Sequence, residues 1–194
     1  MSGSEVLLVI VLVAALALPI VVVVGLVNRR VDGTTRPGDE IAVTAADYLW
    51  FVDEALDGMV EIVRSLGNVL ANRQPDLPGA NSPYALLTHC LGVMEFWGGH
   101  AVAGRIITRD RDAEFVAVGE VDELIERVRL AKAQLRSDLR EMETAGALFG
   151  EIDGEDRDLP VGRTQGGALF HIYEELAQHR GQMEITRDVL LAAS

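Results

Sequence analysis

Two residue types that can bind a metal ion recur at helical spacing near the C-terminus. Glu175 and His179 are four residues apart, so at 100° per residue they lie about 40° apart on one face of a helix. His171 lies one turn earlier on the same line. A carboxylate and an imidazole one turn apart can bind a single ion if another helix supplies a further ligand. The same spacing also occurs in ordinary polar pairs on solvated faces, so the metal hypothesis depends on that further ligand.

The candidate for the further ligand is His89, within the stretch LLTHCLGVMEFW. Val93 and either Phe96 or Trp97 follow it on one helical stripe, so His89 is expected to face the core. A hydrogen-bonded core histidine is the alternative, and for a lone histidine it is the commoner case. His100 is eleven residues further on, which is about 16 Å along a helix axis. The two histidines therefore cannot share an ion, and we expect His100 to be structural or close to the surface.

Four segments carry the apolar periodicity of helices. They cover about residues 44–72, residue 82 to about residue 105, about residues 120–144, and residues 166–189. Thr44 and Ser82 are candidate N-caps, and Pro83 suits the first position of a helix. The charged stretch TRDRDAEF is expected to be a loop, and neither a strand pattern nor an internal repeat is visible. The sequence therefore predicts an all-α fold, a four-helix bundle.

An uncharged run from Val6 to Val27 precedes these segments. Its 22 residues would span about 33 Å as a helix, enough to cross a bilayer core. The basic pair Arg29 and Arg30 follows the run, and positive charge on that side predicts that the body is cytoplasmic. We therefore expect an N-terminal transmembrane anchor (residues 1–30), a linker (31–43) and the helical body (44–194). A cleaved signal peptide fits less well because no basic residue precedes the run, and a start codon further downstream would leave a soluble cytoplasmic protein.

The net charge of the body argues against nucleic acid as a partner. Residues 1–37 carry a net charge of +1 and the whole chain −13, so residues 38–194 carry −14. Such a body repels phosphate backbones, and nucleic-acid binding is not expected.

Cys90 is the single cysteine, which rules out an internal disulfide. It points about 100° away from His89 on the same helix, and we expect a small buried hydrophobe there. Lys132 is the only lysine beside sixteen arginines, a bias typical of high-GC genomes.

Three stretches together carry a resemblance to a known family. NSPYALLTHCLGVMEFW, RDRDAEF and ALFHIYEELAQHRGQMEITRD look like the DinB-like (YfiT-like) superfamily over about residues 44–191. That superfamily includes metal-dependent thiol S-transferases and the N-terminal domain of mycothiol-dependent maleylpyruvate isomerase. The resemblance implies a four-helix bundle whose metal ligands come from the second and last helices. Carried over to this chain, those ligands are His89, Glu175 and His179, while the N-terminal apolar run departs from the typical soluble members.

The function that this set implies is a metal-dependent transferase that joins a low-molecular-weight thiol to small electrophiles. Zinc is the expected metal, and nickel or ferrous iron would suit the same ligands. Mycothiol is the thiol that the high-GC composition favours. His171 could orient Glu175 or act as a base, and plain packing is an equal alternative for it. The alternative function is a non-catalytic, membrane-tethered bundle that binds metal or another protein. A bundle that binds no metal is a third interpretation of the same residues. The sequence also leaves open whether the protein forms a homodimer.

Overall fold

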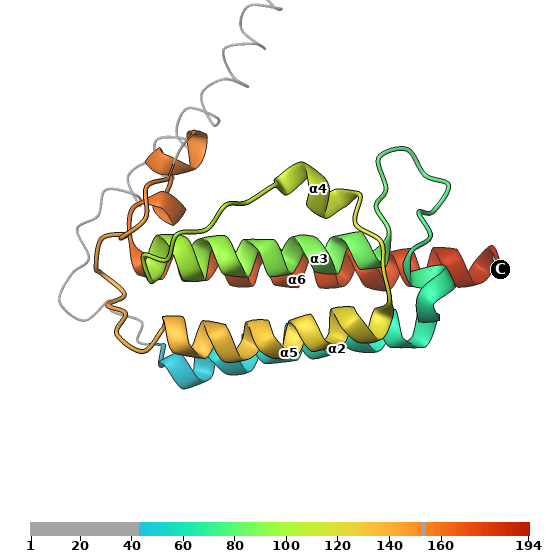
Figure 1. Cartoon of the computed structure of the whole chain (residues 1–194), viewed down its shortest axis with the longest axis horizontal. Helices are drawn as coiled ribbons and strands as arrows, with labels where there is room; N and C mark the ends of the chain where they lie inside the picture. The colour runs from blue at the N-terminus through green and yellow to red at the C-terminus, as the bar shows by residue number, and fades with distance from the viewer. Residues whose placement is uncertain (1–42, 153) are drawn as a thin grey trace, which may run out of the picture. The chain divides into compact units, whose positions relative to one another are not determined.

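The computed structural model describes residues 43–152 and 154–194, and every regular element within them is helical (Figure 1). In chain order these elements are α2 (Ala45–Ala71), α3 (Pro83–Met94), the π-helix η1 (Glu95–Val102), α4 (Arg111–Phe115), α5 (Val121–Asp138), the short 3-10 helices η2 (Glu155–Asp158) and η3 (Pro160–Gly162), and α6 (Gln165–Ala192). The prediction of an all-α fold is confirmed for these residues. The predicted anchor, residues 1–30, and nearly all of the predicted linker lie outside the described range. Among the described helices, none combines the length and the hydrophobicity that crossing a bilayer requires.

Local capping chemistry sets the starts of the first two long helices, at the predicted residues. The Thr44 hydroxyl accepts a hydrogen bond from the backbone N–H of Asp47 at 3.1 Å, and the Asp47 carboxylate accepts one from the N–H of Thr44 at 3.3 Å. This reciprocal pair is a capping box. Ser82 caps α3 by accepting from the N–H of Ala85 at 3.2 Å, and Pro83 occupies the first helical position. Both starts follow from side chains within three residues of the cap.

Two of the observed helices differ from the predicted ones: α2 has the predicted extent but is kinked, and α5 is shorter. Gly67 interrupts α2 with a φ of 62°, a left-handed conformation that suits glycine. Helix α5 ends at Asp138, although its apolar pattern predicted a helix to about residue 144. Beyond that end, the N–H of Glu143 donates to the side-chain oxygen of Gln165, and the Gln165 amide donates to the carbonyl of Ala147, both at 2.9 Å. These hydrogen bonds hold the segment against the start of α6, so its backbone is not free to continue the helix.

The second predicted helix and the charged loop after it also hold more structure than the sequence indicated. The helix changes from α to π geometry at Glu95 and ends at Val102. Gly98, inside the π-helix, packs so closely on α5 that an added Cβ would lie 2.7 Å from a methyl carbon of Leu135. The expected loop contains the five-residue helix α4, whose N-cap is Asp110. Helix α4 lies along α3, and this places it beside the candidate ligands (Figure 1).

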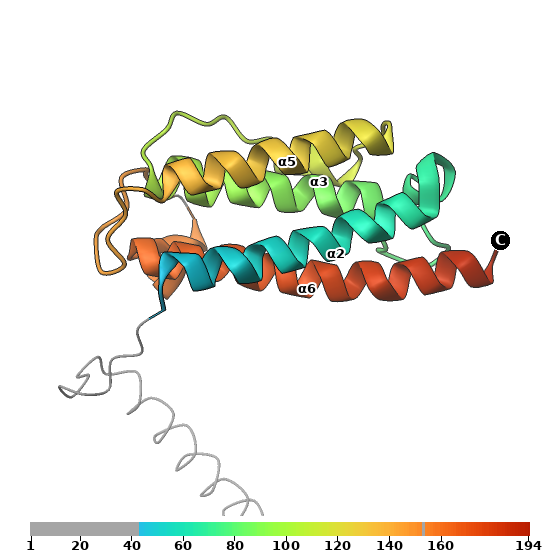
Figure 2. The ribbon, with the colours of Figure 1, turned by 90° about the horizontal axis from the view of Figure 1, so that it is seen from below.

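The four long helices form a bundle in which neighbours in sequence are not always neighbours in space. Helix α2 packs against α6 and α5, and α3 packs against the same two helices (Figure 2). Helices α2 and α6 start at the same end of the bundle, and α3 and α5 start at the other (Figure 1). Helices α3 and α6 therefore run antiparallel in contact with each other. This pairing brings the middle of α3 to the middle of α6.

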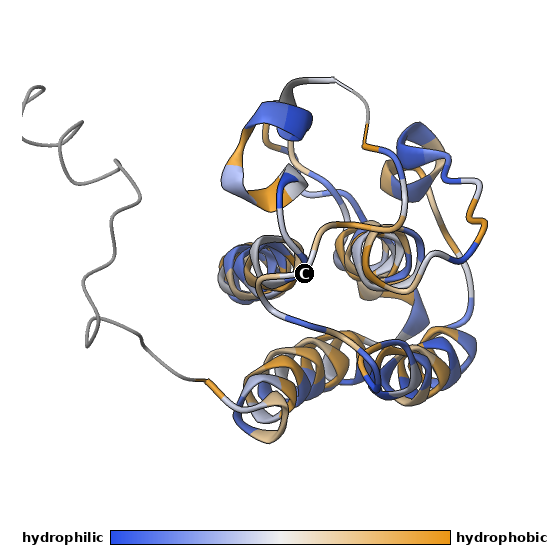
Figure 3. Cartoon of the chain, turned by 90° about the vertical axis from the view of Figure 1, so that its left-hand side faces the viewer, coloured by the Kyte–Doolittle hydropathy of each residue, from blue (hydrophilic) through white to orange (hydrophobic). Residues whose placement is uncertain are grey.

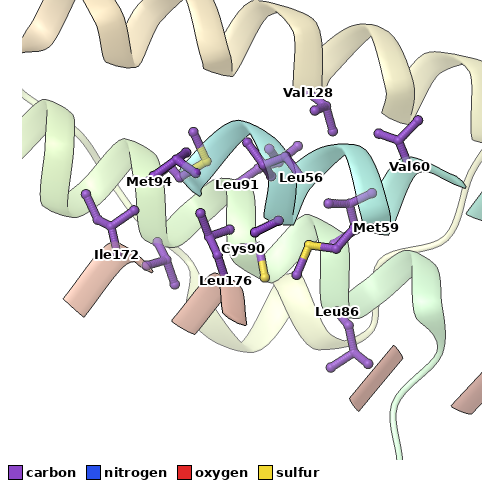
Figure 4. Close-up of a cluster of buried hydrophobic side chains, with 14 of the residues drawn as sticks. Leu56, Met59, Val60, Leu86, Cys90, Leu91, Met94, Val128, Ile172 and Leu176 are labelled. Carbon is purple, nitrogen blue, oxygen red and sulfur yellow. The ribbon is translucent and has the colours of Figure 1, made fainter. Parts of the chain in front are cut away.

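Buried side chains from all four helices fill the space between them. Figure 3, seen along the bundle, shows hydrophilic residues on the outward sides of the helices. The interior cluster in Figure 4 includes Leu56, Met59, Leu86, Cys90, Leu91, Met94, Val128, Ile172 and Leu176. Burying one such side chain contributes about 1.5–3 kcal/mol to stability. The core therefore fixes α3 and α6 against each other independently of any ion.

Candidate metal centre

The centre of the site is the carboxylate of Glu175 on α6. His179, one turn later on the same helix, places its Nε2 atom 3.2 Å from the Glu175 Oε2 atom. His89 on α3 places its own Nε2 atom 3.2 Å from the same oxygen. One donor atom from each residue lies within 4.8 Å of the other two. The structure thus brings together the three residues proposed as ligands from the sequence, across 86 residues of chain.

A buried carboxylate on α4 holds the ring of His89 from behind. The Nδ1 atom of His89 lies 2.8 Å from the Glu114 Oε2 atom, so Nδ1–H donates and Nε2 faces Glu175. Arg109 donates to both oxygens of Glu114, at 2.7 and 2.8 Å. The ring of Phe115 stacks on the imidazole at a centroid distance of 4.4 Å. A carboxylate behind a histidine ligand is the usual support at metal sites, because it fixes the tautomer and the ring orientation.

His179 is held in a similar way by a residue of its own helix. Its Nδ1 atom lies 2.9 Å from the side-chain oxygen of Gln182, three residues later. Donation from Nδ1–H to this oxygen leaves Nε2 directed at Glu175. The sequence H-R-G-Q therefore contains both a candidate ligand and the group that orients it. Because this pair is exposed, we expect it to be weaker than the buried pair behind His89.

The charges of the site perturb the titration of its members. Burial lowers the pKa of His89, but hydrogen bonds to Glu114 and Glu175 raise it more, so the pKa lies above its ordinary value. Burial raises the pKa of Glu114, while hydrogen bonds from His89 and Arg109 outweigh that effect and lower the pKa overall. The hydrogen bonds from His179 and His89 hold the pKa of Glu175 far below its usual range. Both carboxylates are therefore ionised at neutral pH.

The donor set fits a divalent cation. Both ring nitrogens of His89 face carboxylate oxygens, and a neutral imidazole can donate from only one of them. Positive charge is therefore required between His89 Nε2 and Glu175, and either a proton or a metal ion can supply it. Ligand atoms about 2.1 Å from an ion in tetrahedral geometry lie roughly 3.4 Å apart, close to the observed 3.2 Å. Two imidazoles and one carboxylate make the ligand set of a catalytic zinc site, which keeps a further position open.

A cavity of about 310 Å³ opens beside this donor set. His89 and Glu175 line it, and Phe96, Trp97 and His171 form its aromatic wall. The rings of Trp97 and His171 meet edge to face at 5.0 Å. The Nε2 atom of His171 is 3.9 Å from the second oxygen of Glu175, too far for a direct hydrogen bond. Three larger cavities of the described residues contain none of the three donors. Those of about 460 and 810 Å³ are lined mainly by α5 and residues near η1, and one of about 370 Å³ by residues between Ala147 and Arg163.

The other residues singled out in the sequence, His100 and Cys90, are not part of the donor set. His100 is held between the backbone carbonyls of Arg105 and Glu151, at 3.0 and 3.1 Å, in a structural role as predicted. Cys90 is fully buried in the core, and burial raises the pKa of its thiol. A thiol in this environment stays protonated and is not an available nucleophile.

Sequence reasoning missed Glu114 and Arg109, and one local signal could have found them. Gly92 lies inside α3, three residues after His89, where glycine costs about 1 kcal/mol relative to alanine. A Cβ atom at this position would lie 2.0 Å from the Oε1 atom of Glu114. Glycine is therefore required there so that the carboxylate can approach the helix. A glycine one turn from a candidate ligand indicates that another group packs closely behind the ligand.

These features define the class of protein: a helical bundle with a candidate metal centre between its second and last long helices. The family model of the DinB superfamily matches residues 52–183, and the chain belongs to that superfamily, as its motifs predicted. A similar fold is seen in a solved structure described as the conserved protein of a locus from Enterococcus faecalis. It shares 16% identity and a TM-score of 0.60, over 78% of this chain and 99% of that one. Comparison with curated proteins gives no match.

Proposed function

We propose that this protein is a metal-dependent transferase that joins a low-molecular-weight thiol to a small electrophile. The observation that carries the proposal is the donor set of His89, Glu175 and His179, two of which, His89 and Glu175, line a cavity large enough for small reactants. That these residues bind a metal remains a prediction. Zinc is the proposed ion, and nickel or ferrous iron suit the same nitrogen and oxygen donors. Mycothiol is the proposed thiol because of the arginine-rich, high-GC composition.

When bound, the ion supplies a positive charge that lowers the pKa of a thiol at its open position. Glu114 keeps His89 directed at the site, and Gln182 does the same for His179. Phe96 and Trp97 provide the apolar wall against which an electrophile can rest. His171 lines the same cavity and is available to take up the proton that the thiol releases. In an addition to a quinone, sulfur bonds to a ring carbon, the electron pair moves to the carbonyl oxygen, and the proton returns to the adduct.

Metal content is the first test. We expect about one divalent ion per chain in protein dialysed and measured by plasma mass spectrometry. His89→Ala and His179→Ala should each lose most of it, because two donors hold an ion far less tightly than three. His100→Ala is the matched control, since that ring bonds only backbone carbonyls and should leave the metal content unchanged. Stoichiometric metal in His179→Ala would show that the ligand assignment is wrong.

Thiol consumption is the second test. Metal-loaded protein should accelerate the reaction of a thiol with monobromobimane or benzoquinone, and the rate should depend on whether mycothiol, bacillithiol or glutathione is offered. Metal-free protein and Glu175→Ala are the controls. Equal rates for all thiols, with and without metal, would favour the alternative function of a non-catalytic bundle that binds metal or another protein.

We also propose that the run from Val6 to Val27 anchors the chain in the cell membrane with the body in the cytoplasm. Its support is sequence alone: an uncharged run of bilayer length followed by Arg29 and Arg30. A charge near the centre of such a run costs about 2.5–3.5 kcal/mol on insertion. Replacing Val11 and Ala15 with Asp should therefore release protein to the soluble fraction. Protease added outside spheroplasts should leave the body uncut, and its digestion would reverse the proposed orientation.

A further inference from the structure

Three aromatic side chains form a patch on the α2–α6 side of the bundle. Trp50 and Phe51 come from α2, and Tyr173 from α6. Ring centroids lie 4.9 Å apart for Trp50 and Phe51, and 5.8 Å apart for Phe51 and Tyr173. Trp50 is 57% exposed and Phe51 48%. The chain has only ten aromatic residues of these three types, so three of them in one place is a marked concentration.

Within the described residues nothing covers this patch. Trp50, Phe51 and Tyr173 instead line a surface hollow of about 280 Å³ between α2 and α6. Contiguous exposed apolar surface of this kind marks a site where a protein or a membrane is bound. The guanidinium of Arg180 also lines the hollow and donates to the carbonyl of Glu54 at 3.0 Å. The surface is therefore apolar with a polar rim.

The position of the patch in the chain points to one occupant. Trp50 follows Val43, the first described residue, by only seven residues. The segment before Val43 contains the uncharged run Val6–Val27, and residues 28–42 separate the two. Fifteen residues reach at most roughly 50–54 Å when fully extended. If the run is held in a bilayer, as proposed above, Val43 is confined within that distance of the lipid surface, and the patch begins seven residues further along the chain. Such a tether gives an effective concentration on the order of millimolar.

Charge argues against a second copy of the chain as the occupant. Residues 38–194 carry −14, whereas the hollow itself is lined by one acid, Glu54, and one base, Arg180. Two such bodies facing each other would repel. The interfacial region of a bilayer suits the patch better, because tryptophan and tyrosine place an apolar ring beside a polar group that can stay hydrated. Phenylalanine adds apolar area to the same contact.

We propose that this aromatic patch docks on the lipid interface of the membrane and holds the bundle against the bilayer. The inference rests on the proposed anchor, and it adds a second, weaker contact made by the folded body. Because residues 38–194 carry −14, docking should be stronger on zwitterionic than on anionic lipid at low salt. Added salt should reduce this difference, since it screens the repulsion. A basic lipid-binding surface would show the opposite preference.

The two tryptophans make the contact measurable in the full chain. Trp50 is exposed and Trp97 is 2% exposed, so a quencher carried by lipid should reach only Trp50. Full-length protein in phosphatidylcholine vesicles with brominated chains should lose emission from one tryptophan, and Trp50→Phe should abolish that loss. Phe51→Ser should reduce it. Leu130→Ser is the matched control, because Leu130 is similarly exposed, at 52%, and lies on the α3–α5 side.

Three outcomes would overturn the docking. Protein that floats with the vesicles while Trp50 remains unquenched by lipid refutes the docking but leaves the anchor intact. If Trp50 in that case is also shielded from aqueous acrylamide at high protein concentration, a second copy covers the patch. Protein that fails to float refutes the anchor and the docking together. Lipid quenching that is stronger on phosphatidylglycerol than on phosphatidylcholine would contradict the proposal, because a body that carries −14 should dock less well on anionic lipid.

Discussion

Replacing Glu114 with glutamine tests whether the carboxylate behind His89 sets the affinity of the metal centre. The substitution keeps the size of the side chain and removes its charge. His89 Nδ1 then faces an amide, and Arg109 keeps one acceptor oxygen in place of the two that accept from it at 2.7 and 2.8 Å. The imidazole becomes less basic and is free to take another orientation. Groups in this position usually change metal affinity by about 10–100-fold, which corresponds to about 1.4–2.7 kcal/mol.

A second variant reaches the same carboxylate without altering it. Gly92→Ala places a Cβ atom 2.0 Å from Oε1 and 2.5 Å from Cδ of Glu114, so the carboxylate must move. Two hydrogen bonds from Arg109 and one from His89 oppose that movement. Gly92→Ala should therefore weaken metal binding in the same direction as Glu114→Gln, even though alanine favours the helix itself by about 1 kcal/mol. Gly92→Ala moves the carboxylate but keeps its charge. If both variants weaken metal binding, the position of the carboxylate behind His89 matters as well as its charge.

The assay is titration of metal-free protein with zinc against a competing chelator over a series of pH values. Glu126→Gln is the control, because that carboxylate pairs with Arg129 on the exposed surface of α5 and is remote from the site. Circular dichroism would show that all variants remain folded. Wild-type affinity in both Glu114→Gln and Gly92→Ala would refute the role of this carboxylate. Loss in the control as well would show that the effect is not specific to the site.

Three further predictions follow from the same geometry. Cys90→Ala should leave the metal-dependent thiol reaction unchanged in a bimane assay, at a cost of about 1–2 kcal/mol in denaturant unfolding, because the thiol is buried and protonated. Gln182→Ala should weaken zinc binding less than Glu114→Gln does, since its bond to His179 is exposed; a larger effect would reverse the proposed order of support. The pKa of His89 is raised in the folded state, so protonated His89 stabilises the metal-free protein. This contribution to the free energy of unfolding is complete below about pH 6.5 and is lost as the pH rises through the folded pKa. Saturating zinc should reverse this slope of melting temperature against pH, because zinc requires the neutral imidazole.

Much of the fold could be predicted from the sequence because it depends on local rules. The capping box at Thr44 and the cap at Ser82 act over three residues, and the apolar period of α6 is set by the helix itself. The four-residue spacing of Glu175 and His179 placed both on one face before any tertiary contact was known. The sequence motif around them, ALFHIYEELAQHRGQMEITRD, also indicated the superfamily. These features needed only distances along the chain.

Other features depend on which segments meet in space. Helix α5 stops at Asp138 because the following backbone is bonded to Gln165 on another helix. Glu114 lies 25 residues from His89 in a stretch that reads as a charged loop, and its role arises only when α4 packs along α3. The same is true of the aromatic patch, which combines α2 with α6. Charged and aromatic residues in a sequence carry no sign of the partner that they will face.

By itself, the sequence determined the helices, their N-terminal caps and the ligand types, because backbone hydrogen bonding and side-chain periodicity act within a few residues. It did not determine that His89 would lie 3.2 Å from Glu175, or that Glu114 and Arg109 would stand behind it. Those contacts exist because the buried core holds α3 antiparallel against α6, and because Gly92 leaves room for a carboxylate. The identities of the candidate ligands are thus local, whereas the positions of their donor atoms are decided by the packing of the whole bundle.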